Sequence, residues 1–446
     1  MRSIFCLLLA AFCLSARAAD TNSLVWHKAA DRVDADLHGE PLWPLLETIA
    51  RETGWRIYVE PGTTRNASAK FKDLPSGDAL RMLLGDLNFA IVPRTNAASQ
   101  LYVFRTVMQN ATRLVRATNA PAKHVPNELL LKLKPGVNID DLAKLLGAKV
   151  VGRMDKLGIY RLQFGDATAT DVALGKLQNN SDVAEVDYNY YFDPPPSAQP
   201  LANASVPPLS LQLNPPGDSG KVIVGLPDTA EQSLGSPLDK FILPQLSVVG
   251  DASVTGTDPT HGTAMAYSIL EAIAQQSSSG TSVQILPVDI YGSGESTTSW
   301  NVALGIQTAV DNGATVLNLS LGGSGDSSIL DSVIQQTIAD GIPVIVAAGN
   351  DPGVTTYPAA TPGVFAVTAL SQPGQLASYA NDGSYVDLAL PGTSVFYLNG
   401  TAYQVQGTSV STAYASGIAA GNKASTTLTW AQILSAMQQK FAVPAK

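Results

Sequence analysis

The chain has 446 residues, more than one ordinary domain holds, so we expect roughly two to four domains. Hydrophobic residues make up 45% and charged residues 15% of the chain, a composition that excludes wholesale disorder. The formal net charge of −9 argues against a nucleic-acid partner, because a protein that binds nucleic acid needs a basic face to neutralise phosphates.

The N-terminal segment has the pattern of an export signal. Arg2 supplies the positive charge, and residues 4–14 form an apolar run that is too short to span a bilayer. Ala16-Arg17-Ala18 then fits the small-x-small rule for signal cleavage. We therefore expect residues 1–19 to be a signal peptide that directs the chain to the periplasm or the extracellular space.

Both cysteines of the chain, Cys6 and Cys13, lie inside this segment. The exported protein would hold no disulfide bond although it reaches an oxidising compartment, so its stability must come from its core. No later stretch has about 18 uninterrupted apolar residues, and we expect no membrane span.

A first block, residues 20–113, shows the periodicities of a small α+β domain. An apolar face predicts one helix, which ends at Gly54, and Ser76 is a candidate N-cap for a second helix. The two apolar faces consist of Leu42, Leu45, Leu46, Ile49 and Ala50, and of Ala79, Leu80, Leu83 and Leu84, and strands are predicted over 55–59, 89–92 and 101–104.

This block resembles the short N-terminal domain of secretins and TonB-dependent receptors of Gram-negative bacteria. The resemblance lies in the pattern from Leu37 to Val92, including Glu52-Thr53-Gly54 and Ala79-Leu80-x-x-Leu83-Leu84. It implies a module that binds a periplasmic or outer-membrane protein in a Gram-negative bacterium. The periodicity alone also fits a small packing domain that has no partner.

A second block, residues 124–191, has the β-α-β-β-α-β order of a ferredoxin-like domain. Strands are predicted over 128–133, 149–151, 159–164 and 183–186, and helices over 139–146 and 171–177. Two motifs, Pro126-Asn127-Glu128-x5-Lys134-Pro135-Gly136-Val137 and the ending Val186-Asp187-Tyr188-Asn189-Tyr190, resemble the propeptides of secreted subtilases. The resemblance implies a folding chaperone and inhibitor whose C-terminal tail lies in the substrate cleft.

Residues 192–219 are rich in Pro, Ser and Asn and show little periodicity, which is typical of a linker. Any maturation cut is expected between Tyr191 and Lys221. The third block, residues 220–446, then alternates strands with helices, and this alternation favours an α/β fold with a mostly parallel sheet between two layers of helices. Strands are predicted over 222–226, 283–288, 316–319 and 344–347, and helices over 262–273, 299–312 and 329–339.

Four polar residues of the third block follow predicted strands or begin predicted helices. Asp228 and Asn350 come just after strands, and His261 and Ser409 begin helices. In open α/β sheets, working residues lie at the carboxyl ends of strands. Taken singly, each of these residues has an ordinary structural explanation, such as a turn aspartate, a buried histidine or a serine N-cap.

Together the four residues supply what hydrolysis by a serine needs. A serine hydroxyl requires a base within hydrogen-bond reach, and the base requires a carboxylate that orients it. Hydrogen-bond donors must also be placed where the oxyanion will form. Of the four histidines in the chain, only His261 lies in the third block. His261 is therefore the one histidine of the third block that could act as the base.

The motifs around these residues resemble the subtilase family. Their order along the chain is that of the family, and the motifs are Asp228-Thr229, His261-Gly262-Thr263, Ala347-Ala348-Gly349-Asn350 and Gly407-Thr408-Ser409. The resemblance extends over nearly all of residues 221–441. It implies a subtilisin-like three-layer α/β fold, preceded here by the two small α+β domains.

The resemblance also implies a role for each residue. Ser409 is the nucleophile, His261 the general base, and Asp228 the carboxylate that orients the imidazole. The Asn350 side chain and the Ser409 backbone N–H bind the oxyanion. The implied activity is that of a secreted, self-processing serine endopeptidase that acts through an acyl-enzyme.

A polypeptide substrate is expected to bind as an extended strand, mostly through backbone hydrogen bonds. The residues implied to line it are Leu319, Ser320, Leu321 and Gly322 on one side and Ala347, Ala348 and Gly349 on the other. Residues 320–322 and 347–349 would wall the main specificity pocket with small side chains that leave room for an apolar group. Thr356 would narrow this pocket.

Several positions depart from the family pattern without removing a reacting group: Ala230, Ala264, Tyr267, Ala413 and Tyr414. Tyr267 is bulky, and a shift of the His261 helix by about 1 Å would cost on the order of 10²-fold in rate. The alternative function is therefore a low-activity or inactive peptidase-like protein that binds or senses in the periplasm.

The implied reaction requires no cofactor and no metal. Subtilases often bind structural calcium, and the sequence leaves this open, because no carboxylate-rich loop identifies a site.

Overall fold

The computed structural model describes residues 23–60, 63, 65–93, 99–111, 113–115, 123–192, 197–202, 209–217, 220–250, 254, 256, 258–276, 280–294, 296–352 and 354–444. The expected signal peptide and both cysteines lie outside these residues. The described chain forms two compact units, one built mainly from residues 23–108 and the other mainly from residues 123–444.

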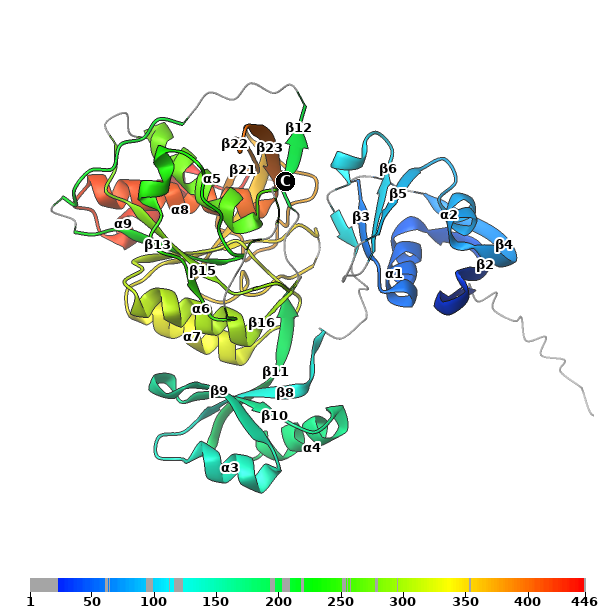
Figure 1. The fold of residues 1–446 in the computed structure, drawn as a ribbon, viewed down its shortest axis with the longest axis horizontal. Helices are drawn as coiled ribbons and strands as arrows, with labels where there is room; N and C mark the ends of the chain where they lie inside the picture. The colour runs from blue at the N-terminus through cyan, green and yellow to red at the C-terminus, as the bar shows by residue number, and fades with distance from the viewer. Residues whose placement is uncertain are drawn as a thin grey trace, which may run out of the picture. The chain divides into compact units, whose positions relative to one another are not determined.

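The described residues of the first unit form two α-helices and two sheets (Figure 1). One sheet has the strand order β1-β2-β4, and β5, β6 and β3 follow one another in the second. The elements are β1 (Ser23–His27), β2 (Arg32–Pro41), α1 (Leu42–Thr53), β3 (Arg56–Val59), β4 (Asn66–Pro75), α2 (Ser76–Leu84), β5 (Asn88–Val92) and β6 (Gln100–Phe104), and β7 (Arg113–Val115) follows them.

Both helices of this unit bury the apolar faces predicted for them, except that Ala50 of α1 is only half-buried. Leu46 and Ile49 of α1 and Leu80 of α2 are fully buried, and Gly54 ends α1 in a left-handed conformation with φ 77°. The prediction for Ser76 is wrong, because this residue is the first of α2 and makes no capping hydrogen bond. Pro75 precedes it, and the fixed φ of this proline ends β4 and lets the helix begin at once.

The second unit begins with the ferredoxin-like order of elements. Its antiparallel strands lie in the order β11-β8-β10-β9, and α3 and α4 cover one face of the sheet. The elements are β8 (His124–Leu133), α3 (Ile139–Leu146), β9 (Lys149–Met154), β10 (Ile159–Gln163), α4 (Ala167–Leu177) and β11 (Val183–Phe192). We refer to this part, residues 123–192, as the N-terminal subdomain.

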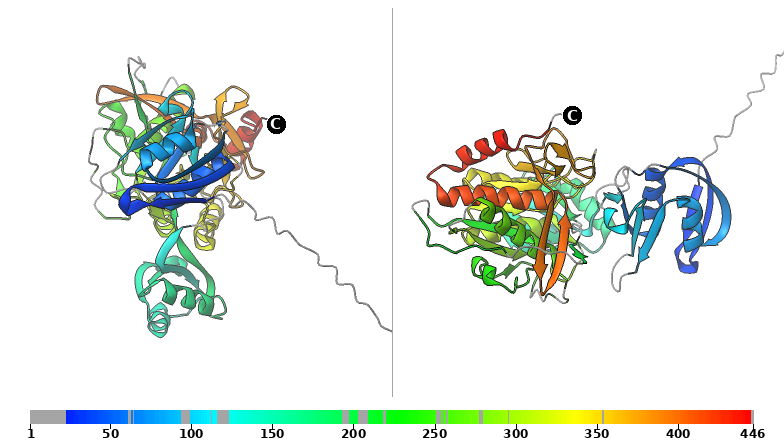
Figure 2. Two further views of the ribbon diagram at one scale, coloured as in Figure 1. Left: turned by 90° about the vertical axis from the view of Figure 1, so that its right-hand side faces the viewer. Right: turned by 90° about the horizontal axis from the view of Figure 1, so that it is seen from above.

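The sheet of this subdomain is buried on both faces. Leu129 and Leu131 of β8 pack with the apolar residues of α3 and α4, whereas Leu130 points to the opposite face and packs with the third block. Figure 2 shows the two helices on the side of the sheet that faces away from the third block. The alternation of side chains along β8 thus joins the two parts of the unit.

The third block is built on a mostly parallel sheet with helices on both faces (Figure 1). The parallel strands lie in the order β14-β15-β13-β17-β18-β19, with β20 antiparallel beyond β19 and β21 also paired to β19. The sheet strands are β13 (Ile223–Asp228), β14 (Leu246–Ser247), β15 (Gln284–Asp289), β17 (Val316–Leu319), β18 (Val344–Ala347), β19 (Phe365–Gln372), β20 (Gln375–Leu376) and β21 (Leu388–Pro391).

Two cores fill the space between the sheet and the helices. Val224 and Leu226 of β13 face α5 (His261–Gln276), α8 (Thr408–Ser425) and α9 (Trp430–Lys440). Ile223 points to the other face, toward α6 (Ser299–Asp311) and α7 (Ser328–Ala339). Strands buried on both faces read as unbroken apolar runs, which is why the sequence predicts these elements well.

Part of the segment that we expected to be a linker is packed on the third block. Residues Gln199–Leu201 form β12, which pairs with β23 (Thr401–Gln406), and β23 pairs in turn with β22 (Thr393–Leu398). Leu211 is buried in the core beside α5. The pairing of β12 with β23 joins residues 199–201 to residues 402–404, so no local sequence pattern reveals it.

Candidate active site

Asp228 is the last residue of β13, a central strand of the sheet. Its side chain is 2% exposed, and the Thr229 backbone N–H donates to Asp228 Oδ1 at 2.7 Å. β13 thus places the buried carboxylate of Asp228 at the carboxyl edge of the sheet, as the sequence predicts.

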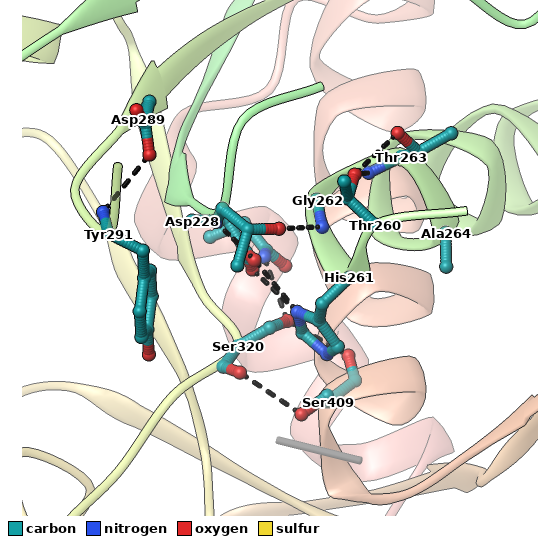
Figure 3. Close-up of polar contacts among 12 residues, drawn as sticks. Asp228, Thr260, His261, Gly262, Thr263, Ala264, Asp289, Tyr291, Ser320 and Ser409 are labelled. Atoms are coloured by element: carbon teal, nitrogen blue, oxygen red, sulfur yellow. Dashed lines mark hydrogen bonds and ion pairs between the residues drawn. The ribbon is translucent and has the colours of Figure 1, made fainter. Parts of the chain in front are cut away.

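His261 is the first residue of α5 and is 5% exposed. Its Nδ1 lies 2.8 Å from Asp228 Oδ1 and 2.9 Å from Asp228 Oδ2 (Figure 3). Within the part of the chain that the structure describes, Nε2 is buried and has no hydrogen-bond partner. One ring nitrogen is therefore held by the carboxylate while the other is free to exchange a proton.

Gly262 fixes the direction of the helix that carries His261. Its backbone N–H donates to Thr229 Oγ1 at 2.8 Å, and a Cβ added at this position would collide with the Thr229 carbonyl oxygen. The glycine therefore lets α5 begin against the turn that follows Asp228. This close approach brings the imidazole to the carboxylate.

Ser409 is the second residue of α8 and is 4% exposed. Figure 3 shows the imidazole of His261 between the Asp228 carboxylate and the Ser409 side chain. Ser409 Oγ donates to the Ser320 carbonyl at 3.0 Å, and Ser320 Oγ donates to the Ser409 carbonyl at 2.9 Å. This reciprocal pair ties the start of α8 to the segment after β17.

Asn350 lies three residues beyond β18 and reaches the start of α8. Its Oδ1 accepts hydrogen bonds from the Thr408 backbone N–H at 2.9 Å and from Thr408 Oγ1 at 3.0 Å. The Nδ2 group is thereby turned away from Thr408, and it lies near Gly407, where a Cβ would be 3.2 Å from it. Sequence reasoning included Thr408 in a motif but did not find this orienting role.

The predicted substrate-binding residues lie where β17 and β18 end. Leu319 is the last residue of β17 and Ala347 the last of β18, and the two parallel strands are paired up to Leu319 and Val346. The side chains of Leu319, Ser320, Leu321, Ala347 and Ala348 are buried. The two glycines, Gly322 and Gly349, are half-buried.

The end of β11, which we call the tail (residues 187–192), lies beside this segment. Tyr191 and Phe192 pair with β16 (Thr297–Thr298), and Phe192 lies 3.2 Å from where a Cβ of Gly323 would stand. The sequence predicted that the strand ends at residue 186. Pairing with β16 carries it on to Phe192.

Two polar side chains of the tail cap helices of the third block. Asp187 Oδ2 accepts from the Ser328 backbone N–H at 2.8 Å, at the start of α7. Asn189 is fully buried, and its Oδ1 accepts from the Trp300 backbone N–H at 3.0 Å, at the start of α6. Free N–H groups at helix starts need such acceptors, so the N-terminal subdomain completes both helices.

The bulky residues that depart from the family pattern are accommodated without separating His261 from Asp228. The Tyr267 ring stacks on Phe396 of β22 with the ring centres 5.2 Å apart. Tyr414 Oη donates to Glu271 Oε2 at 2.7 Å, and Ser394 Oγ donates to the same oxygen at 2.8 Å. The two tyrosines thus help to join α5, α8 and β22, and sequence reasoning missed Glu271 as the hydrogen-bond partner of Tyr414.

Glu231 is a further carboxyl group near the site that sequence reasoning missed. Its Oε1 is buried and makes no hydrogen bond within the described residues. Burial, together with the negative charge of Asp239, raises the pKa of Glu231 to about 8. This carboxyl group is therefore mostly protonated at neutral pH.

The described residues contain no group of three or more His, Cys, Asp or Glu side chains that could hold a metal ion. No helix among them is both long and apolar enough to cross a membrane.

Two family models match the second unit. The subtilase family matches residues 232–442, and a family described as the fervidolysin N-terminal prodomain matches residues 110–189. Among solved structures, fervidolysin from Fervidobacterium pennivorans, a keratinolytic enzyme related to subtilisin, aligns with a TM-score of 0.55 and 19% identity. The alignment covers 71% of this chain and 57% of that chain, and at this identity it shows a shared fold alone.

Curated relatives are similar over the third block. Subtilisin from Bacillus pumilus is 34% identical over 196 residues, which cover 40% of this chain and 70% of that protein. Subtilisin amylosacchariticus from Bacillus subtilis subsp. amylosacchariticus has the same identity, with 51% of its length covered, so this chain spans about half the length of several relatives it matches. The thermophilic serine proteinase of Bacillus sp. (strain AK1) is 28% identical over 326 residues, which cover 69% of this chain and 80% of that protein.

Proposed function

The chain belongs to the subtilase family, and from this premise we propose that it is an exported serine endopeptidase that hydrolyses peptide bonds through an acyl-enzyme. The observation that carries the proposal is the position of His261. Its Nδ1 contacts Asp228 at 2.8 Å, while its buried Nε2 has no hydrogen-bond partner within the described residues and lies on the side of Ser409.

In the proposed reaction, Ser409 Oγ attacks the scissile carbonyl carbon while His261 Nε2 takes the hydroxyl proton. Rotation about χ1 of Ser409 turns Oγ from the Ser320 carbonyl toward the imidazole, and such bonds often form only when substrate binds. His261 then passes the proton to the leaving amine, and water releases the acyl group by the same steps. Asp228 holds the imidazole in the required tautomer and stabilises its charged form.

We assign the oxyanion site to the Asn350 Nδ2 group and the Ser409 backbone N–H. The hydrogen bonds from Thr408 to Asn350 Oδ1 support this, because they leave the amide's donor end available. The start of α8 adds the partial positive charge of a helix N-terminus. In a subtilisin, removing one oxyanion donor costs about 10²–10³-fold in kcat, and we expect a loss of the same order if the Asn350 amide is removed.

The substrate in this proposal is a polypeptide in extended form, bound beside residues 319–322 and 347–349. The buried side chains of these segments favour recognition through the backbone, which is how an added strand binds. A side chain of the substrate would enter between the two segments, next to Gly322 and Gly349.

We further propose that the N-terminal subdomain inhibits the peptidase until it is removed by self-processing. The tail supports this, because Phe192 lies against Gly323, the residue that follows the proposed substrate-binding segment. Two further parts of the proposal rest on the sequence. Residues 1–19 would export the chain to the periplasm or the extracellular space, and the first block would bind a periplasmic or outer-membrane partner. The contact between His261 and Asp228 favours a peptidase over an inactive binding or sensing protein.

The test compares the purified wild-type chain with Ser409→Ala and with Ser425→Ala, an exposed serine at the far end of the same helix. We expect the wild type and Ser425→Ala to hydrolyse casein and to accumulate a shorter form of the chain, and Ser409→Ala to do neither. Casein hydrolysis by Ser409→Ala at the wild-type rate would exclude the proposed nucleophile. If all three chains accumulated equally at full length, self-processing would be excluded, but the proposed hydrolysis of peptide bonds would not.

A further inference from the structure

Helices α5 and α8 pack against each other and run in the same direction. A Cβ added to Gly417 of α8 would collide with the Ile269 carbonyl oxygen of α5. One turn later in α8, a Cβ added to Gly421 would lie 3.3 Å from Nε2 of Gln276, which is further along α5. The residue numbers rise together on both helices, so the start of one helix lies beside the start of the other.

His261 and Ser409 lie in the first turns of these two helices (Figure 3). Their relative height therefore depends on how far α8 is displaced along α5. An α-helix rises by about 1.5 Å per residue, and a displacement of about 1 Å between reacting groups can cost on the order of 10²-fold in rate. A slide of one helix by less than one residue would thus be enough to slow the proposed reaction.

Apolar packing holds the two helices together. Side chains of both helices share one core, among them Ile269, Ala272, Val410 and Ala413. Burial of apolar surface is not directional, so it favours contact between the helices without closely fixing one height over another. A hydrogen bond does fix the height, because it weakens steeply when its atoms move apart or out of line.

Glu271 of α5 supplies such a directional contact to α8. Its half-buried Oε2 accepts a hydrogen bond from Tyr414 Oη at 2.7 Å and another from Ser394 Oγ of β22 at 2.8 Å. The Tyr414 hydroxyl also lies 3.2 Å from the carbonyl of Thr393, the residue before Ser394. Burial, and then the negative charge of Glu271, raise the pKa of Tyr414, so its hydroxyl keeps the proton and stays a donor. Hydrogen bonds to a carboxylate are about twice as strong as those between neutral groups.

The two donors flank Ser409 in the chain. Ser394 precedes it in the hairpin of β22 and β23, which leads into α8, and Tyr414 follows it five residues later in the same helix. One carboxylate on the helix that begins with His261 therefore holds the segment that carries Ser409 at two points. Tyr414 is one of the positions that depart from the family pattern, so this link belongs to the present chain.

We propose that Glu271 is a positioning residue that, through Tyr414 and Ser394, fixes the height of Ser409 relative to His261 and so sets the rate of acylation rather than the affinity for substrate. The inference rests on the proposed function, because it concerns the proposed nucleophile and its base. Glu271 itself touches neither of them and acts through the two helices.

The experiment measures kcat and KM for a peptide p-nitroanilide that ends in alanine, and the second-order rate constant with which a fluorophosphonate probe modifies Ser409. The amount of protein that the probe labels at completion gives the concentration of active molecules, so incomplete maturation of a variant does not distort kcat. The proteins are the active wild type, Tyr414→Phe, Ser394→Ala, Glu271→Leu, Glu271→Gln and the double variant of Tyr414→Phe with Glu271→Leu. Tyr414→Phe and Ser394→Ala each delete one donor, and they carry the test if Glu271→Leu does not fold.

The matched control is Ile269→Val, which removes one methyl group from a fully buried residue of the same helix without touching the link. We expect it to lower the thermal unfolding midpoint and to leave kcat unchanged.

We expect Tyr414→Phe and Glu271→Leu each to lower kcat and the labelling rate by about 10-fold, with KM unchanged, because a shift of less than 1 Å is at stake. Ser394→Ala should cause a smaller loss, and Glu271→Gln, which keeps an acceptor oxygen, should retain most of the activity. The double variant should lose no more than the larger single loss, because both changes remove the same link.

Unchanged kcat in both Tyr414→Phe and Ser394→Ala, or an equal loss in Ile269→Val, would overturn the role of Glu271 and leave the peptidase assignment standing. A loss that appears in KM alone would overturn it as well. A wild type that neither hydrolyses the peptide nor reacts with the probe would overturn the proposed function, and this inference with it.

Discussion

At the scale of single residues, the site depends on close approaches that only particular side chains permit. Gly262 lies against the Thr229 carbonyl oxygen, and a side chain there would push α5 away from β13. Asn350 is turned by Thr408, which sits next to the serine that the amide is proposed to assist. The positions of Asp228, His261 and Ser409 therefore depend on their immediate neighbours in the chain, Thr229, Gly262 and Thr408.

The sequence predicted these residues because each lies in a short motif at the end of a strand or the start of a helix. It could not predict how Tyr267 and Tyr414 are accommodated. Their partners, Phe396 and Glu271, come from segments that no local pattern relates to them. Local motifs report which groups can react, whereas the packing around them depends on contacts distant in sequence.

A residue-scale prediction concerns Glu231, whose pKa is raised to about 8 from the ordinary value of 4.5. The folded state favours the protonated carboxyl group, so the stabilisation is fully present below about pH 4.5 and is lost as the pH rises through about 8. We expect the thermal unfolding midpoint of the Ser409→Ala chain to decrease as the pH is raised from about 5 to about 9. This variant is used because it lacks the proposed nucleophile and should not digest itself. Adding Glu231→Gln should make this fall smaller.

Calorimetric scans of the two chains across this pH range check the prediction. Equal falls in both chains would show that Glu231 does not titrate in the folded state as proposed.

At the scale of elements, the sequence predicted those that are amphipathic or buried on both faces. The structure has α3 over Ile139–Leu146, β17 over Val316–Leu319 and β18 over Val344–Ala347, the ranges that periodicity indicates. The elements that it missed or cut short depend on partners far along the chain. β11 continues to Phe192 because β16 pairs with it, and β12 is a strand because β23 pairs with it.

An element-scale prediction concerns the contact between the tail and α7. Burial raises the pKa of Asp187, although the hydrogen bonds from Ser328 and Tyr190 oppose this. The docked tail thus favours the protonated carboxyl group of Asp187. Docking is therefore expected to weaken as the pH rises from 3.8, the ordinary pKa of this group, through its raised pKa in the docked state. Asp187→Asn keeps an acceptor for the Ser328 N–H without a titrating charge, so it should remove this part of the pH dependence.

Hydrogen–deuterium exchange of β11 in the full-length Ser409→Ala chain measures this, after correction for intrinsic exchange at each pH. Protection should decline with rising pH in that chain and in an added Asp141→Asn control, which changes an exposed residue of α3, and should stay nearly level with Asp187→Asn. The same decline in all three chains would contradict the prediction.

At the scale of the whole molecule, the described chain divides into two units, and the N-terminal subdomain belongs to the same unit as the third block. The three sequence blocks predicted the order of the parts but not this grouping. It arises because β8 presents Leu130 to the third block and because the tail caps α6 and α7. These contacts hold the N-terminal subdomain against the part of the chain that we propose it inhibits.

The most direct test of the central claim is covalent labelling of the proposed nucleophile. The chain is incubated with a fluorophosphonate probe before and after removal of the N-terminal subdomain, and the modified residue is mapped by mass spectrometry. We expect the probe to modify Ser409 after removal of the N-terminal subdomain, and we expect His261→Ala to abolish labelling, because the hydroxyl then lacks its base. Labelling of a different residue, or none at Ser409 once the N-terminal subdomain is gone, would contradict the assignment of Ser409 as the nucleophile.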